Sequence, residues 1–283
     1  MVEIPEPATF INLARYPIHD PGDDATRALI ERCRGELESQ AFTVLDDFLP
    51  HEAVARFWDE SMALSDLTVR REKTRSAYLD TPDEEDTSWP QGHPRRQFFH
   101  TSWGVVADDL IPDSHGLRML YAWEGLTAFF SEVLQVRPLY RHADRFQALN
   151  INVLTPGDEQ AWHFDDMDFV VLLYLTTPEA GGELECASLV RNDDDPCYDK
   201  VARAFDGTYA QLHRRPSVAG TLTIMRGNHS VHRVYPVEGE TPRLTAVLAY
   251  DRVPDKYEGD AINIQMYGER VREKIEAGFN KPE

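Results

Sequence analysis

The 283-residue sequence has few cysteines and no long apolar run, and each scarcity excludes a class of protein. Its three cysteines, Cys33, Cys186 and Cys197, show no CxxC spacing, so they do not form a disulfide framework, and we expect free thiols in a reducing compartment. The longest apolar stretch, residues 169–175, is far too short to span a bilayer. Neither a basic nor an apolar signal-peptide region stands in the N-terminal sequence MVEIPEPATF, so we expect a cytoplasmic protein.

Positive charge is also scarce in this chain. There are 29 Lys and Arg residues against 49 Asp and Glu residues, which gives a formal net charge of −20 at pH 7. Such a field repels phosphate backbones and anionic membranes, so we expect neither nucleic acid nor membrane as a partner. A small-molecule substrate is the expected partner, and the sequence leaves a homodimer open. Hydrophobic residues make up 42% of the chain, which is enough for a globular core.

The first half of the chain is typical of helices and a lid. Apolar residues at helical spacing predict helices over residues 25–40, 51–64 and 116–135, and residues 41–49 alternate like a short strand. Residues 80–97 are rich in proline and charge, which indicates a long loop or lid. We therefore interpret residues 1–140 as helical support and lid.

From residue 146 the sequence changes to short strand-like runs. These runs are separated by Gly and Pro turns and interrupted by a short helical insert at residues 198–205. They cover residues 146–154, 169–175, 183–190, 221–225, 230–237 and 244–250. Evenly spaced short strands favour an antiparallel barrel or jelly roll. We predict a mainly β fold with added helices, in which residues 146–252 form a jelly-roll core and residues 1–283 form one catalytic domain.

A metal site is suggested by the segment WHFDD, which places His163 two residues before Asp165. Residues two apart on a strand point to the same face, so the imidazole and the carboxylate converge. His142 and Asp144 have the same spacing, and the motif alone does not choose between them. His142 lies before the barrel, in the charged run YRHADR, and we interpret it as a surface-loop histidine.

The distal part of the expected site lies in residues 220–250. His229 adjoins a Gly-Asn turn, whereas His232 lies inside a strand-like run and is the better candidate for a third ligand. Two histidines and one carboxylate leave coordination positions of ferrous iron open. Arg243 follows after a Gly-containing turn, where its guanidinium can bind a carboxylate through two hydrogen bonds. Thr245 lies two residues later, on the same face of the expected strand.

In this order and spacing, the motifs resemble those of the Fe(II)/2-oxoglutarate-dependent oxygenases. The resemblance covers about residues 146–252 and implies a double-stranded β-helix. The segments WHFDDMDFVV, PEAGGELE and GTLTIMRGNHSVHRVYPVEG are similar to the branch that halogenates or hydroxylates free amino acids. Halogenases of that branch replace the metal carboxylate with a small residue. Because Asp165 is present here, the resemblance implies an oxygenase rather than a halogenase.

The resemblance also implies roles for individual residues. His163, Asp165 and His232 are expected to bind Fe(II), and Arg243 to hold the far carboxylate of 2-oxoglutarate, with O2 as the third reactant. No catalytic side chain is expected beyond the metal ligands.

Polar residues around this core are expected to contact the bound molecules. Thr245 and Asn152 are expected near the cosubstrate, and Asp166, Gln160 and Arg96 near the substrate. The residue types also fit purely structural roles. Asn152 and Gln160, like Asn150, can instead satisfy each other by hydrogen bonding. Arg96 can be a solvated loop charge, and Asp166 can be a solvated acid.

Three functions fit the sequence. The first is oxidation of an unactivated C–H bond in a free amino acid or derivative, by hydroxylation, desaturation or ring closure such as cyclopropanation, in specialised metabolism. The second is hydroxylation of a peptide or protein side chain, which the lid at residues 80–97 disfavours. The third is a non-catalytic jelly roll that binds metal, which Arg243 disfavours. The sequence does not specify the substrate, the position of oxidation or the oligomeric state.

Overall fold

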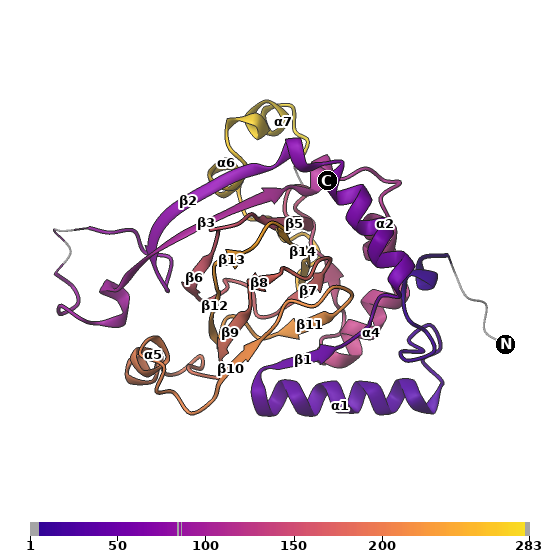
Figure 1. Cartoon of the computed structure of the whole chain (residues 1–283), viewed down its shortest axis with the longest axis horizontal. Coiled ribbons are helices and arrows are strands. Elements are labelled where there is room, and N and C mark those ends of the chain that lie inside the picture. Colours follow the sequence, from indigo (N-terminus) through magenta and orange to yellow (C-terminus); the bar gives the residue numbers. More distant parts are fainter. Residues whose placement is uncertain (1–5, 84, 86, 281–283) are drawn as a thin grey trace.

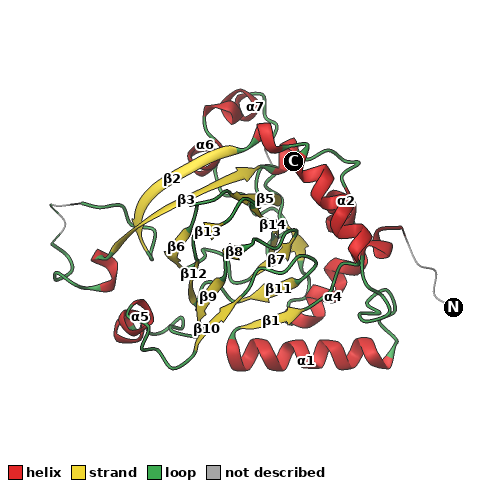
Figure 2. Ribbon diagram, viewed as in Figure 1, coloured by secondary structure: helices red, strands yellow, loops and turns green. Residues whose placement is uncertain are grey.

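The structure is a computed structural model that describes residues 6–83, 85 and 87–280. Two antiparallel sheets form its centre (Figures 1 and 2), a seven-stranded sheet of order β1-β11-β7-β14-β5-β3-β2 and a four-stranded sheet of order β10-β9-β12-β6. The larger sheet contains β1 (Phe42–Leu45), β2 (Val69–Ser76), β3 (Phe98–Val106), β5 (Leu149–Leu154), β7 (Val170–Tyr174), β11 (Leu222–Met225) and β14 (Arg243–Leu248). The smaller sheet contains β6 (Gln160–His163), β9 (Leu184–Ala187), β10 (Leu212–Arg215) and β12 (Val231–Val234).

The remaining strands form two short pairs. β8 (Ala180–Gly181) pairs with β13 (Val237–Glu238), and β4 (Tyr140–Arg141) pairs with β15 (Tyr250–Asp251). Most strands that neighbour each other in the sheets are distant in sequence, such as β1 and β11 or β5 and β14, as in a jelly roll. The predicted mainly β, double-stranded β-helix fold with added helices is confirmed.

Helices cover the outer face of the larger sheet. Buried residues of β5, β7, β11 and β14 share one core with these helices, and they include Ile151, Leu173, Ile224 and Ala246. The helices are α1 (Asp24–Gln40), α2 (His51–Met62), α3 (Gly116–Ala122) and α4 (Glu124–Leu134). Short 3-10 turns are η1 (Glu6–Phe10), η2 (Ser65–Leu67) and η4 (Asp108–Leu110), and a further one, η3 (Pro94–Arg96), lies in the lid between β2 and β3. The alternate residues of the same strands face inward, toward the smaller sheet.

The predicted helix over residues 116–135 is two helices. Trp123 ends α3 and begins α4 with extended backbone (φ −72°, ψ 120°). Its indole packs over Gly125, where a Cβ atom would lie 2.2 Å from the ring. The periodic apolar pattern continues through the break, which is why the sequence predicted one helix.

Two long strands and the C-terminal helices were not anticipated. β2 and β3 pair over eight positions and form the curved arm beside the barrel (Figure 1), although residues 1–140 were expected to hold mainly helices and a loop. β2 reads VRREKTRS, which lacks the apolar alternation of a half-buried strand. The insert α5 (Tyr198–Phe205) is confirmed, while α6 (Asp260–Tyr267), η5 (Glu269–Val271) and α7 (Arg272–Glu276) follow the barrel.

The C-terminal helices are fixed to the arm by one buried carboxylate. Asp109 lies just after β3, and its side chain is fully buried. It accepts hydrogen bonds from Arg270 at 2.9 and 3.0 Å and from Lys274 at 2.7 Å. The C-terminal segment also packs on β3, because Tyr267, Val271 and Ile275 are buried in one cluster with Trp103 and Val105. None of the helices in the described residues is long and apolar enough to cross a membrane.

Candidate metal centre and cosubstrate pocket

The two sheet neighbours β6 and β12 bring two histidines together. His163 ends β6 and lies directly opposite His232 in the antiparallel register, with ring centroids 4.2 Å apart. Asp165 follows two residues after His163. Its Oδ1 atom lies 3.8 Å from Nε2 of His163 and 3.6 Å from Nε2 of His232. Potential ligand atoms of all three residues lie within 4.8 Å of one another.

Each imidazole is oriented by a backbone carbonyl. Nδ1 of His163 donates to the carbonyl of Ala161 (2.8 Å), and Nδ1 of His232 donates to the carbonyl of Ser230 (2.9 Å). These bonds fix the tautomer and leave both Nε2 lone pairs free for a metal. Burial, with the nearby imidazole of His232, holds the pKa of His163 well below its usual value, so the ring is neutral.

The carboxylate also fits a metal ligand. Oδ2 of Asp165 is buried and has no hydrogen-bond partner among the described residues. A buried anionic oxygen without a partner costs several kcal/mol unless a cation satisfies it. Two neutral imidazole nitrogens and one carboxylate on one face suit ferrous iron with open positions. The donor set therefore fits the group that the sequence predicted.

Gly227 makes room for this carboxylate. Its carbonyl accepts from the amide of Asp165 (3.2 Å), and a Cβ atom at residue 227 would lie 1.7 Å from Oδ2 of Asp165. We predict that Gly227→Ala turns the carboxylate away and weakens Fe(II) binding by about 10- to 100-fold, as changes behind a metal ligand do.

Anaerobic Fe(II) titration of Gly227→Ala, with circular dichroism as the control for folding, measures that loss. Gly207→Ala is the matched control, because a Cβ atom at residue 207 meets nothing within 4 Å. Its φ of +78° disfavours alanine, but this backbone strain is the same with and without bound metal. Unchanged affinity in folded Gly227→Ala would show that Asp165 does not need its observed orientation.

The competing histidines are occupied elsewhere. His229 contacts Asp193 through Nε2 (2.8 Å) and lies outside the metal cluster. The interpretation of His142 as a surface-loop histidine was wrong. Its side chain is 1% exposed, and its Nε2 contacts Glu258 at 3.2 Å. Asp144 is buried as well and accepts from Asn263 and Asn280, so this pair fixes the C-terminal segment.

Arg243 is the largest fully buried side chain of the protein's described part. It begins β14, its Nε atom has no hydrogen-bond partner among the described residues, and its guanidinium carbon lies 5.2 Å from the ring centroid of Tyr174. Burial lowers the pKa of Arg243 from its ordinary value. Thr245, on the same face, has a buried hydroxyl that likewise lacks a described partner. These unsatisfied donors can hold a carboxylate.

The two polar residues of β5, Asn150 and Asn152, have different surroundings. Asn150 donates to the carbonyl of Gln147 (3.0 Å) and accepts from Tyr267 (3.0 Å), so it is a structural residue. Asn152 lies opposite Thr245 in the register, on the inward face. It is therefore well placed beside the donors of β14.

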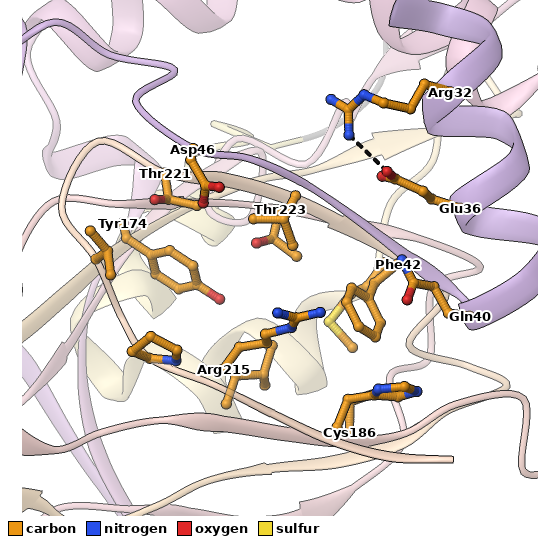
Figure 3. Close-up of a pocket in the computed structure, with 16 residues that line it drawn as sticks. Arg32, Glu36, Gln40, Phe42, Asp46, Tyr174, Cys186, Arg215, Thr221 and Thr223 are labelled. Atoms are coloured by element: carbon orange, nitrogen blue, oxygen red, sulfur yellow. Dashed lines mark hydrogen bonds and ion pairs between the residues drawn. The ribbon is translucent and has the colours of Figure 1, made fainter.

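A cavity of about 370 Å³ opens between β1, β7 and β11 on one side and β9 and β10 on the other (Figure 3). The Tyr174 ring and the Arg215 side chain reach into it, and the ion pair of Arg32 and Glu36 lies at its rim. His163, Asp165 and His232 do not line this cavity. Tyr174 links this cavity to Arg243, because its ring centroid lies 5.2 Å from the guanidinium carbon of Arg243.

The predicted substrate residues lie in different surroundings. Asp166 is an exposed residue beside the metal cluster, and partial burial of its carboxyl together with the charges of Asp165 and Glu258 raises its pKa. Gln160 lies opposite Val234, and an irregularity in β6 places it on the same face as His163. Arg96 donates to the carbonyl of Trp89 (3.1 Å) within the lid, and among the described residues no contact links it to the metal cluster.

Arg75 is a residue that sequence reasoning missed. It lies on the inward face of β2, where Asp165 and Asp166 are its charged neighbours. Its guanidinium carbon is 5.7 Å from the ring centroid of Trp103, and burial lowers its pKa. The sequence would have indicated Arg75 only if residues 69–76 had been recognised as a strand. Side chains alternate between the two faces of a strand, which places Arg75 on one face with Lys73 and Arg71.

Comparison with known families gives a match over most of the chain. The family described as Halogenase D matches residues 25–262. No curated protein matches the chain.

Solved structures share the fold at low sequence identity. The epimerase SnoN of nogalamycin biosynthesis, in complex with Fe3+, alpha ketoglutarate and nogalamycin RO, is 16% identical, with 84% of this chain and 90% of that chain covered at a TM-score of 0.55. The carbocyclase SnoK of nogalamycin biosynthesis is 13% identical, with 78% and 83% covered at a TM-score of 0.53. AviO1 from Streptomyces viridochromogenes Tue57 is 20% identical, with 79% and 93% covered at a TM-score of 0.51.

Proposed function

This chain belongs to the halogenase D family of Fe(II)/2-oxoglutarate-dependent oxygenases, and on that premise we propose that it oxidises an unactivated C–H bond of a free amino acid or derivative. In this proposal His163, Asp165 and His232 hold Fe(II). Arg243 and Thr245 hold the far carboxylate of 2-oxoglutarate, with Asn152 beside them. With O2 and 2-oxoglutarate, bound iron supplies the oxidising chemistry. The chain binds and orients the substrate and excludes water.

One observation supports an amino acid above other small molecules. An acid and a base, Asp166 and Arg75, lie beside the metal cluster, and the charge of each influences the pKa of the other. Among the described residues, neither side chain forms an ion pair or a hydrogen bond. A free amino acid carries an ammonium and a carboxylate a few ångströms apart. We assign the ammonium to Asp166 and the carboxylate to Arg75, with Gln160 beside them.

The lid favours a small substrate over a peptide. Arg95 binds Asp80 at 3.0 Å and the hydroxyl of Tyr198 at 3.3 Å. Trp89 and His93 stack with centroids 4.3 Å apart, and His93 also meets Tyr198 edge-on at 4.3 Å. These contacts join the lid to α5 rather than leave an open groove for an extended chain.

The retained carboxylate supports oxygenation rather than halogenation. Oδ1 of Asp165 lies 3.8 Å from Nε2 of His163 and 3.6 Å from Nε2 of His232, so the carboxylate can take the metal position that a halide would need. Hydroxylation is the default outcome, and desaturation or ring closure can take its place. Structures of the same fold include an epimerase and a carbocyclase of nogalamycin biosynthesis, which agrees with a role in specialised metabolism.

The test is a succinate-release screen over free amino acids with Fe(II), 2-oxoglutarate and O2. We expect at least one amino acid to raise succinate formation well above the uncoupled rate.

For that substrate, Asp166→Asn should raise KM about 10- to 100-fold, since it removes one charge-assisted contact. Asp168→Asn is the matched control in the same loop, because Asp168 is paired with Arg252 at 2.9 Å. If no amino acid stimulates a protein that binds Fe(II) and 2-oxoglutarate, the proposed substrate class is wrong.

A further inference from the structure

The inward face of β2 carries three cationic side chains in a row. Arg71, Lys73 and Arg75 alternate along the strand, so they share one face. They lie opposite Trp103, Thr101 and Phe99 of β3, respectively. Among the described residues, none of the three side chains forms a hydrogen bond or an ion pair. We call these residues the β2 cation stripe.

The opposite face of the same strand behaves differently. Arg70 binds both carboxylate oxygens of Asp158, one of them at 2.7 Å, and Glu72 contacts His100 at 3.0 Å. Charges on the outer face are therefore neutralised within the protein. The cation stripe forms no such pairs with the described residues, in a chain whose formal net charge is −20.

The stripe is partly desolvated. Nε of Arg71 is buried without a described partner, and burial lowers the pKa of Arg71. Burial also lowers the pKa of Lys73, and repulsion by Arg71 and Arg75 lowers it further. The two guanidinium groups keep their charge in a protein at neutral pH. Charged groups gathered and desolvated without counter-charges are costly, and a bound anion relieves that cost.

Within the described part of the chain, counter-charge lies near one end of the stripe. Asp165 and Asp166 influence the pKa of Arg75, and Arg75 influences the pKa of His163, so Arg75 is the cation of the stripe whose charge reaches the metal cluster. Neither acid influences the pKa of Arg71 or Lys73. Two residues of strand span roughly 6.6 Å, which places Lys73 and then Arg71 progressively farther from iron.

We propose that Arg71 and Lys73 form an anion subsite, and that the substrate carries a second anionic group, a carboxylate or a phosphate, beyond the carboxylate held by Arg75. The proposal rests on the proposed function for the assignment of Arg75 to the amino-acid carboxylate. It narrows the substrate class to an acidic or phosphorylated amino acid, bound with its acidic end away from iron.

The first test measures binding to anaerobic protein loaded with Fe(II) and saturating 2-oxoglutarate, which prevents the probes from competing at Arg243. Isothermal titration compares O-phospho-L-serine with L-serine, and L-glutamate with L-glutamine. We expect the acidic member of at least one pair to bind about 10- to 100-fold more tightly. This preference should weaken as NaCl rises, because salt screens partly exposed charges. The pair with the larger preference identifies phosphate or carboxylate.

The second test removes the subsite. The double variant Arg71→Gln, Lys73→Gln should abolish the preference for the acidic probe while the affinity for its neutral partner stays unchanged. Arg70→Gln is the matched control, since it removes a cation from the same strand but from the opposite face. Equal binding of acidic and neutral probes, or a preference that survives in the double variant, would overturn the anion subsite.

A third set of probes separates this proposal from the proposed function. Inorganic phosphate and glycerol 3-phosphate carry the anion without the amino-acid group. If they bind and the double variant loses them while no amino acid binds, the subsite is supported and the amino-acid assignment fails. If neither these anions nor the acidic amino acids bind to protein that retains Fe(II) and 2-oxoglutarate, the subsite itself is refuted.

Discussion

Replacing His232 with alanine is expected to abolish tight Fe(II) binding and to lower succinate formation at limiting iron on the order of a thousand-fold, because loss of a ligand removes several kcal/mol of metal stabilisation. His232 is 5% exposed, and its Nδ1 atom is committed to the carbonyl of Ser230. Its Nε2 atom is therefore free for iron. His163 already supplies the other nitrogen, so it cannot replace the lost ligand.

His229 provides a control only three residues away. Its ring is paired with Asp193 at 2.8 Å and belongs to the turn after β11. His229→Ala should retain Fe(II) affinity and the weak visible band that appears when 2-oxoglutarate chelates Fe(II) under anaerobic conditions. If both variants bind iron equally, or if His229→Ala alone loses the band, the third ligand has been assigned to the wrong histidine.

The metal cluster was predictable because strand geometry is local. A spacing of two places His163 and Asp165 on one side, and a histidine inside a strand-like run is a better ligand than one in a turn. That reasoning selected His232 over His229, and the structure brings His232 opposite His163. The position of Arg243 at the start of a strand followed from similar reasoning, since that strand could be recognised from its apolar residues.

The arm and its cations were not predictable in the same way. β2 is an edge strand with a polar outer face and a cationic inner face, so apolar periodicity does not mark it. Arg75 is close to Asp165 only because β2 pairs with β3 and β3 with β5. The interpretation of His142 as a surface-loop histidine was wrong for a related reason. Its charged surroundings in sequence suggested solvent, but the C-terminal segment packs over it in the fold.

Arg243→Met is expected to raise the KM for 2-oxoglutarate about 100- to 1000-fold, because a two-pronged, charge-assisted contact in a buried site contributes roughly 3–4 kcal/mol. Methionine keeps most of the volume of the arginine side chain, so the barrel should stay folded. Activity should recover in large part at very high 2-oxoglutarate, since iron and substrate contacts are unchanged. Thr245→Val removes a single neutral hydroxyl and should raise the same KM only about tenfold or less.

Arg215 supplies the competing assignment, because its side chain reaches into the cavity of Figure 3, whereas Arg243 does not line that cavity. If 2-oxoglutarate occupied that cavity, Arg215→Met would raise the KM for 2-oxoglutarate and Arg243→Met would not. We expect the reverse, since Arg215 is exposed and Arg243 is 2% exposed. In water a cation keeps its hydration and gains little from a carboxylate. The buried guanidinium of Arg243 is cut off from that hydration, so we expect the cosubstrate carboxylate to bind most strongly there.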